Sequence, residues 1–374
     1  MVAFRRLAQR LRPAKPPAAA PAPNLLTPAR YDEVERAALQ RQPVPVLMAF
    51  RPVTYQVVGF PVHVSDEAEL IRYVDHNFEH EVPGLFSPGA RFAPIAYVNA
   101  FTPDERALFD QVRERVVAMT ANRFGRTVRP VTNLMVQMGP FRIMHEIARA
   151  SGKQQLAVFE AGPGMGYLGA LLALTGHRYT SFDVTQALYL WQNRLLETIS
   201  GSELVETAGQ VNIPALDGAR IAHLPWWQFT QLLGNCPLHA DIVYSNSNLG
   251  EMGLLALKHL LEISRAILAE SEIGLFMYMS TGATMQSTAE SLAVEFRQFG
   301  YVKVCDTPFV AYTLGERNVA PLLGAFKNGV PHYSPSGSAA TLTANEVMAL
   351  KRSEAPLDWH IATWNYGWQA PFVD

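Results

Sequence analysis

A run of closely spaced glycines marks the place in this sequence where a ligand could meet the backbone. The segment Glu160–Gly169 reads EAGPGMGYLG and follows a short apolar run. Glycines at this spacing let the chain turn sharply and approach a ligand that a Cβ atom would exclude. An acid, Asp183, follows Gly164 at about the distance at which a nucleotide-binding βαβ unit places a ribose-binding carboxylate. The segment therefore predicts a ligand that contains a nucleoside.

Two patterns fit these residues, and they imply different ligands. Gly164, Gly166 and Gly169 match the GxGxxG spacing of a dinucleotide site. With Glu160 included, the run also matches an acid followed by three alternating glycines. A dinucleotide site holds a pyrophosphate at a helix N-terminus, where the Glu160 carboxylate would repel it. S-adenosyl-L-methionine carries an ammonium group and no phosphate, so we predict this methyl donor, with Asp183 accepting hydrogen bonds from the ribose hydroxyls.

The segments that must position these residues alternate between strand and helix patterns, which predicts an α/β fold. Short apolar runs are expected to form strands, and amphipathic or small-residue runs to form helices. The expected strands are 156–162, 178–184, 241–247, 273–280 and 301–307, and the expected helices are 102–125, 140–152, 167–176, 185–199, 250–270 and 287–300. We predict a Rossmann-like, doubly wound and mostly parallel sheet with an N-terminal helical and mixed cap. In such folds ligands bind at the carboxyl ends of the strands.

Composition divides the chain into four expected regions. Residues 1–29 are basic, lack acidic residues and are rich in proline and alanine, which predicts a disordered tail. Residues 30–139 are expected to form the cap; within it, Val46–Val64 is β-rich and broken by prolines, which favours an edge strand or hairpin. Residues 140–313 are expected to form the core. Residues 314–374 form an aromatic-rich extension that could complete the sheet; its aromatic side chains favour core packing or a homodimer contact over stacking on a sugar.

The whole-chain properties exclude several classes of protein. The formal charge of −2 over 374 residues lacks the basic excess that nucleic-acid binding usually requires. Two cysteines, Cys236 and Cys305, lie far apart, which argues against a disulfide scaffold and favours a reducing compartment. The sequence has neither a secretory apolar region nor a run long enough to span a bilayer. We expect a cytoplasmic protein without nucleic-acid partner or membrane span, a mitochondrial presequence being the alternative for the N-terminal tail.

Three stretches resemble class I S-adenosylmethionine-dependent methyltransferases: EAGPGMGYLG, SFDVTQALYLWQNRLL and DIVYSNSNLGEM. The second stretch is similar, more narrowly, to the sugar O-methyltransferase family of bacterial polysaccharide and natural-product clusters. The close resemblance covers about residues 140–280. It implies O-methylation of a sugar or glycosylated small molecule by in-line methyl transfer with general-base assistance.

The resemblance also implies roles for individual residues. The backbone after the first strand would hold the methionine part and the ribose, and Glu160 would line the amino-acid end. The segment 223–229, expected as a loop, would pack against the adenine, with Trp226 or Trp227 over the base; both tryptophans could equally be core. Asn246 and Asn248 would face the sulfonium and the acceptor, or end the strand in a turn. The expected cofactor-binding residues are Glu160, Ala161, Gly162, Pro163, Gly164, Gly166, Asp183, Val184, Trp226 and Asn246.

The general base is chosen from three candidates, because the acceptor hydroxyl must lose a proton as it attacks. Glu251 follows the fourth expected strand and is the best placed, although an acid at a helix start also stabilises the helix dipole. His223 lies in the expected adenine-side loop, and His145 lies in the helix before the glycine strand. No compact acidic cluster follows the fourth strand, so we expect no metal site.

Two other functions stay open on sequence grounds. An NAD-dependent oxidoreductase would use the GxGxxG pattern, but it needs a catalytic Tyr-Lys or His pair that the sequence does not display. A protein that binds the donor without catalysis would keep the fold and show no turnover with any acceptor.

Overall fold

The computed structural model describes residues 26–41, 63–75, 93–95, 97–98, 102–130, 132–210, 212–214, 216, 218–234, 236–246, 248–278, 288–305, 309–317, 319, 322, 332–333 and 364–366. The expected tail up to residue 25, and the β-rich segment Val46–Val64 apart from its last two residues, lie outside these ranges. Within the described residues, no helix combines the length and the hydropathy that a bilayer crossing requires.

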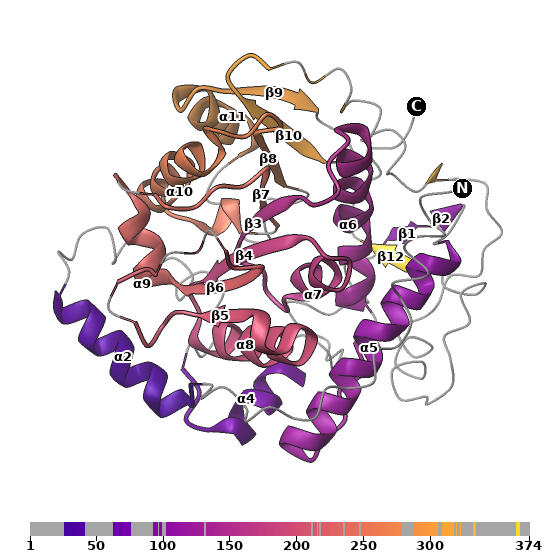
Figure 1. Ribbon diagram of the computed structural model, residues 1–374, viewed down its shortest axis with the longest axis vertical. Coiled ribbons are helices and arrows are strands. Elements are labelled where there is room, and N and C mark those ends of the chain that lie inside the picture. The colour runs from indigo at the N-terminus through magenta and orange to yellow at the C-terminus, as the bar shows by residue number, and fades with distance from the viewer. Residues whose placement is uncertain are drawn as a thin grey trace.

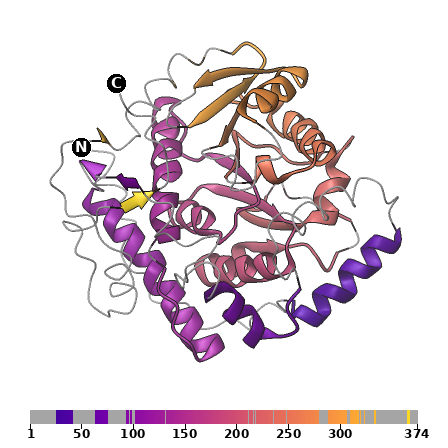
Figure 2. The same ribbon diagram turned by 180° about the vertical axis from the view of Figure 1, so that it is seen from behind.

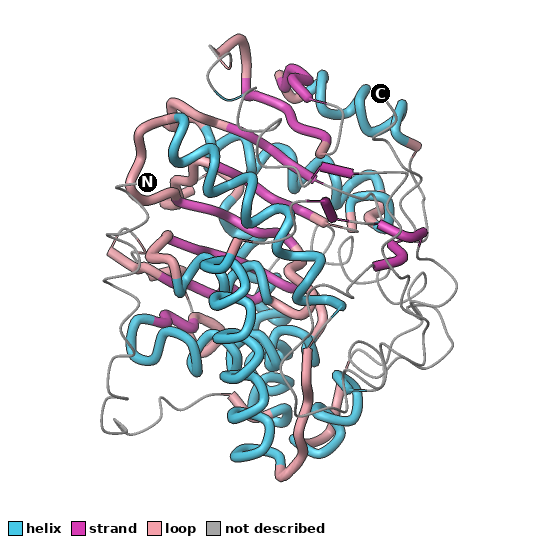
Figure 3. Tube along the Cα trace, turned by 90° about the vertical axis from the view of Figure 1, so that its right-hand side faces the viewer, coloured by secondary structure: helices cyan, strands magenta, loops and turns pink. Residues whose placement is uncertain are grey.

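An eight-stranded sheet forms the centre of the molecule, with its strands stacked one above the other in Figure 3. Its strands are β3 (Ala157–Ala161), β4 (Arg178–Asp183), β5 (Leu204–Glu206), β6 (Ile221–Pro225), β7 (Ile242–Ser245), β8 (Leu275–Tyr278), β9 (Tyr301–Cys305) and β10 (Val310–Leu314). They lie in the order β5-β6-β4-β3-β7-β8-β10-β9. The first six strands of this order pair in parallel, and β10 runs antiparallel to both of its neighbours. The predicted mostly parallel, Rossmann-like α/β sheet is confirmed.

The last two strands distinguish this sheet from the dinucleotide-binding arrangement. When the strands are numbered along the chain with β3 as the first, and the short edge strand β5 is left out, their order across the sheet is 3-2-1-4-5-7-6. The dinucleotide fold has the order 3-2-1-4-5-6. Here β10 inserts antiparallel between β8 and β9, so the sixth strand no longer lies beside the fifth.

Helices cover both faces of the sheet, and the chain moves from one face to the other when it passes from β6 to β7. Helices α5 to α8 pack against one another on one side, and α10 and α11 lie on the other (Figures 1 and 2). Their bounds are α5 (Pro103–Phe124), α6 (Thr132–Ala150), α7 (Tyr167–Leu174), α8 (Gln186–Ser200), α9 (Trp226–Phe229), α10 (Leu254–Leu268) and α11 (Ala289–Gln298). From β3 the chain winds outward through β4 and β6, then returns to β7 on the other side of β3. Right-handed crossovers place the two windings on opposite faces and leave a switch point between β3 and β7.

The N-terminal helices form a partial cover over α8. Helix α2 (Pro28–Arg41) and helix α4 (Glu67–Val74) both pack against α8, and α2 also reaches α9. The buried guanidinium of Arg194 on α8 anchors this cover, because it donates to the Leu26 carbonyl oxygen at 3.0 Å and pairs with Glu67. Gln186, the first residue of α8, donates from Nε2 to the Pro28 carbonyl oxygen at 3.2 Å, so the cap also reaches the carboxyl end of β4.

Local sequence explains the helix ends. The Glu105 backbone N–H donates to Thr102 Oγ1 and the Thr102 N–H donates to Glu105 Oε2, so α5 begins with a capping box. Gly125 ends this helix in the left-handed conformation. Helix α6 was expected to begin at Pro140, but it begins at Thr132 and contains that proline. Burial of Met138 on one side of the proline and Phe141 on the other supports the continuous helix.

The C-terminal extension pairs with the segment before α5. Strand β12 (Trp364–Tyr366) pairs with β1 (Ala93–Ile95), and β11 (His332–Tyr333) pairs with β2 (Tyr97–Val98). Both pairs are small separate sheets. The two described strands of the extension, β11 and β12, thus pair with strands before α5 and not with the main sheet.

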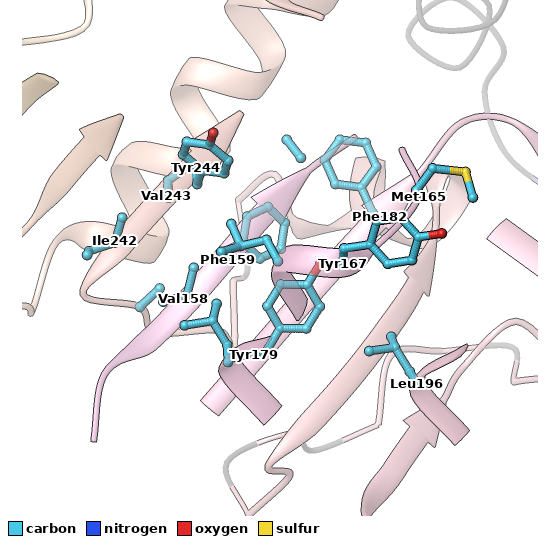
Figure 4. Close-up of a cluster of buried hydrophobic side chains, with 14 of the residues drawn as sticks. Val158, Phe159, Met165, Tyr167, Tyr179, Phe182, Leu196, Ile242, Val243 and Tyr244 are labelled. Atoms are coloured by element: carbon cyan, nitrogen blue, oxygen red, sulfur yellow. The ribbon is translucent and has the colours of Figure 1, made fainter. Parts of the chain in front are cut away.

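Aromatic packing holds the carboxyl half of the central strands. Figure 4 shows buried side chains of β3, β4 and β7 together with Met165 from the glycine loop and Tyr167, the first residue of α7. The rings of Phe182 and Phe229 stack with centroids 3.7 Å apart, and Phe159 stacks on both. Each buried phenylalanine contributes roughly 1.5–3 kcal/mol. This cluster fixes the strand that ends at the next residue, Asp183.

Candidate functional site

Several predicted ligand-binding residues meet at the carboxyl edge of the sheet. In the strand register Ala161 lies opposite Phe182 of β4 and Ser245 of β7. The residues that follow these positions are Gly162, Asp183 and Asn246, so they lie together at the switch point. Open α/β sheets bind ligands at this place. The structure thus brings the glycine loop, the acid and the end of β7 to one edge.

The glycine loop needs its glycines for two separate reasons. Gly162, Gly164 and Gly166 have φ of 66°, 57° and 73°, in the left-handed region that side chains rarely adopt. At Gly162 a Cβ would also overlap the side-chain amide of Asn248. Beside Gly164, nothing lies within 4 Å of the position that a Cβ would take. The loop therefore exposes backbone with open space at Gly164, where a ligand can approach.

Gly169 has a different role. It lies inside α7, and a Cβ there would overlap the ring of Tyr179 on β4. The third glycine of the GxGxxG pattern is thus explained by close packing of a helix on a strand. Such packing also occurs in dinucleotide folds, so this glycine does not discriminate between the two predicted ligands.

Glu160 is buried beneath the loop. Its side chain is 1% exposed, and the Tyr179 hydroxyl donates to Oε2 at 2.6 Å. Burial raises the pKa of Glu160 to about 8; the bond from Tyr179 lowers it and the nearby Asp183 raises it further. The carboxyl group is therefore mostly neutral at pH 7. Burial of Glu160 therefore weakens the expectation that its charge would repel a pyrophosphate.

Asp183 ends β4 with both carboxylate oxygens oriented. Oδ1 accepts from the Thr185 backbone N–H at 2.9 Å and from its hydroxyl at 2.7 Å, and Oδ2 accepts from Gln192 Nε2 at 2.8 Å. Burial raises the pKa of Asp183, while these hydrogen bonds lower it. The Thr185 hydroxyl donates to Asp183, so this residue makes no side-chain capping bond to α8, which it precedes. Val184 follows, half-buried, between the acid and α8.

The end of β7 is tied to the glycine loop. Asn248 Nδ2 donates to the Ala161 carbonyl oxygen at 2.6 Å, and the Ser245 hydroxyl bonds to Asn248 Oδ1. Asn248 therefore holds the glycine loop in place, a structural role that the sequence pattern did not predict. Asn246 follows β7 at the same edge and is half-buried.

His223 and Trp226 lie in regular structure rather than in the expected loop. His223 is within β6 and fully buried, with Nδ1 2.7 Å from Asn193 Oδ1 and its ring stacked on Tyr189. Burial lowers its pKa to about 3. Trp226 begins α9, is buried, and donates from Nε1 to Glu35 Oε1 at 2.8 Å. The expectation of a loop was wrong because β6, buried between β4 and β5, has no alternating polar positions.

The other two candidate bases occupy opposite edges of the sheet. His145 on α6 faces His177, with ring centroids 6.5 Å apart, and His177 accepts from the backbone N–H of Leu156 just before β3. This is the amino edge, away from the glycine loop. Glu251 ends the 3-10 turn η5 (Leu249–Glu251), which follows β7 at the carboxyl edge. Of the three candidates, Glu251 is the one that follows a strand at this edge.

Three side chains of the cap are close enough to act as metal ligands. Asp32, Glu35 and His63 offer ligand atoms within 4.8 Å of one another. The His63 ring lies between the acids, with Nδ1 2.7 Å from Asp32 and Nε2 3.7 Å from Glu35. Gln186 Nε2 donates to Asp32, and Trp226 donates to Glu35. Hydrogen bonds account for the cluster, which ties α2 to the ends of β4 and β6.

Comparison with known proteins gave structural neighbours only. No family model matches the sequence, and no curated protein matches it. Magnesium protoporphyrin IX methyltransferase from Synechocystis PCC 6803 with bound SAM shares 12% identity over 57% of this chain and 99% of that one, with a TM-score of 0.32. A TehB-like SAM-dependent methyltransferase from Corynebacterium glutamicum shares 14% identity over 57% and 100%, with a TM-score of 0.33. The glycopeptide N-methyltransferase MtfA, complexed with (S)-adenosyl-L-homocysteine, shares 11% identity over 46% and 86%, with a TM-score of 0.30.

These neighbours are similar in fold to part of this chain. Identities and TM-scores at this level do not assign a reaction or a substrate. We therefore infer the function of this chain from the residues of the site.

Proposed function

We propose that this chain is an S-adenosyl-L-methionine-dependent methyltransferase that methylates an oxygen of a sugar or glycosylated small molecule. One observation carries the proposal: the open, left-handed glycine loop and the oriented Asp183 lie side by side at the switch point. The loop presents backbone to the amino-acid part of a ligand, and Asp183 presents a carboxylate to ribose hydroxyls.

The residues present fit this donor. Gly164 leaves room at the loop, and backbone from Ala161 to Gly166 would hold the methionine part. Asp183 would accept from the ribose, and half-buried Val184 would contact the adenine. Trp226 is committed to Glu35 by its indole N–H, so it would support the adenine side rather than cover the base with an exposed face.

The sheet order separates this proposal from an NAD-dependent oxidoreductase. The antiparallel β10 between β8 and β9 departs from the parallel six-strand order of dinucleotide folds. The glycine spacing alone fits either ligand, and burial of Glu160 removes part of the charge argument. The topology therefore supports the methyl-donor reading independently of the glycine pattern.

Proton removal is assigned to Glu251 in this proposal. When bound, the donor supplies an electrophilic methyl group on a sulfonium, which leaves as a neutral thioether. The acceptor hydroxyl must lose its proton as the new carbon–oxygen bond forms. Glu251 follows β7 at the edge of the glycine loop and would take that proton. Asn246, at the same edge, would orient the acceptor.

The acceptor class rests on the resemblance of SFDVTQALYLWQNRLL to sugar O-methyltransferases. We would incubate the purified chain with S-adenosyl-L-methionine carrying a labelled methyl group and with a panel of sugars, glycosides, amines and phenols. Label transferred to the oxygen of a sugar or glycoside supports the proposal. Label transferred only to nitrogen would refute O-methylation while keeping the methyltransferase, and donor binding without transfer would favour a non-catalytic protein.

A further inference from the structure

The side-chain amide of Gln192 connects two parts of the candidate donor site. Gln192 lies on α8 and is 1% exposed. Its Nε2 donates to the Gly164 carbonyl oxygen at 2.6 Å and to Asp183 Oδ2 at 2.8 Å. Gly164 belongs to the loop after β3, and Asp183 ends β4. One amide group therefore fixes the loop and the carboxylate relative to each other.

The chemistry of its partners fixes the orientation of this amide. Carbonyl and carboxylate oxygens accept hydrogen bonds and donate none, so only the NH₂ end of the amide can face both. The stem of the side chain also contacts the loop: a Cβ on Gly166 would lie 3.2 Å from Gln192 Cγ. The indole of the preceding Trp191 adds a bond to the Met165 carbonyl oxygen at 3.1 Å. Helix α8 thus holds the loop at consecutive residues.

The other end of the amide suggests that Gln192 is not simply a core residue. Its Oε1 is buried and has no hydrogen-bond partner among the described residues. An unsatisfied buried amide oxygen destabilises the fold, and a leucine of similar size would avoid that cost. Residues that break a local rule in this way concentrate at functional sites.

We propose that Gln192 is a positioning residue of the donor site, which holds Asp183 and the glycine loop in the arrangement that the ribose and methionine parts of the donor require. This inference rests on the proposed function. An uncharged hydrogen-bond donor suits this position, because the glutamine amide orients the Asp183 carboxylate without forming an ion pair with it. The charge on Asp183 then stays available to the ribose hydroxyls.

The test is calorimetric titration with S-adenosylhomocysteine of the wild-type chain and of Gln192→Leu, Gln192→Glu and a control. Gln155→Leu is the matched control, because Gln155 Nε2 also donates to a glycine carbonyl, that of Gly176 at 2.6 Å, at the amino edge of the sheet. We expect Gln192→Leu to weaken binding roughly tenfold to a hundredfold, the range for a hydrogen bond to a charged group. The control should bind as the wild type does.

The glutamate variant separates positioning from mere packing. Gln192→Glu keeps the shape but brings a second carboxyl group to Asp183. The affinity of Gln192→Glu for S-adenosylhomocysteine, divided by that of Gln192→Leu, should therefore fall as the pH rises from about 5.5 to 8.5, because two ionised carboxylates in contact repel. Glu160 on β3 and Tyr73 on α4 also interact electrostatically with Asp183. Both variants keep Glu160 and Tyr73, so the ratio of the two affinities cancels the titration of these residues.

Each outcome decides between the alternatives. Wild-type affinity in Gln192→Leu, or a ratio that does not change with pH, would overturn the positioning role. Should the leucine variant fail to fold, the pH profile of folded Gln192→Glu relative to the wild type carries the same test. No binding by the unsubstituted chain would overturn the proposed function itself, and this inference with it.

Discussion

The buried carboxyl group of Glu160 makes stability depend on pH in a direction that the structure specifies. In the folded chain burial raises its pKa to about 8, from an ordinary value of 4.5. Below pH 4.5 the carboxyl group is protonated in both the folded and the unfolded chain, so it does not lower the free energy of unfolding. As the pH rises from 4.5 toward 8, the free energy of unfolding falls, because the carboxyl group ionises in the unfolded chain first. Each pH unit in this window costs about 1.4 kcal/mol, so the total loss is roughly 5 kcal/mol, as an order of magnitude.

Glu160→Gln should remove this loss. Glutamine keeps the shape and a carbonyl oxygen for the Tyr179 hydroxyl, but it cannot ionise. We expect the variant to match the wild type near pH 4.5 and to be more stable than it by several kcal/mol at pH 8. Urea denaturation of both proteins at intervals from pH 4.5 to 9 measures the difference.

An exposed acid provides the control for this measurement. Glu33 on α2 pairs with Arg30 at the surface, and Glu33→Gln should change stability little at any pH. A stability difference between Glu160→Gln and the wild type that stays constant over the whole pH range would show that the pKa of Glu160 is not raised in the folded chain.

Three further predictions concern the site. Asp183→Ala should lose about 1.5–3 kcal/mol of donor binding, measured by calorimetry with S-adenosylhomocysteine; unchanged affinity would remove Asp183 from the ribose site. Glu251→Gln should lower kcat about 10²–10⁴-fold in steady-state assays while donor affinity stays the same, and a normal rate would exclude Glu251 as the base. Gly162→Ala should destabilise the fold more than Gly164→Ala in urea denaturation, because both have positive φ but only the first meets Asn248; equal losses would contradict that packing.

The parallel core could be predicted because each strand is a short apolar run that ends at a turn signal. Strands β3, β4, β7, β8 and β9 lie within the expected ranges. Strand β6 could not be identified in the same way. Its five residues include His223 and end in Pro225, before two tryptophans, and this composition is typical of a loop. Burial between β4 and β5 overrides that local signal.

The glycine loop and Asp183 could also be predicted, because backbone conformation and strand-end position follow from spacing along the chain. The side chains that hold them could not. Gln192 and Asn248 reach the loop from elements far away in the sequence. A weak signal exists for Gln192: it is a polar residue on the helix face that also carries Leu188 and Leu195, and such a residue needs a partner when buried.

The charge state of Glu160 shows a further limit of local reasoning. A glutamate beside a glycine loop is expected to be ionised at pH 7 from its type alone. Its pKa depends on burial beside Tyr179 and Asp183 of the neighbouring strand β4, which no local pattern contains. The sequence therefore predicted the position of Glu160 correctly, but its charge state follows only from the tertiary structure.

Calorimetric titration of the purified chain with S-adenosylhomocysteine, and separately with NADH, decides between a methyl donor and a dinucleotide as the ligand of the glycine loop. We expect micromolar binding of S-adenosylhomocysteine and none of NADH. Binding of NADH alone would contradict this expectation, and the glycine loop would then hold a dinucleotide in spite of the antiparallel β10.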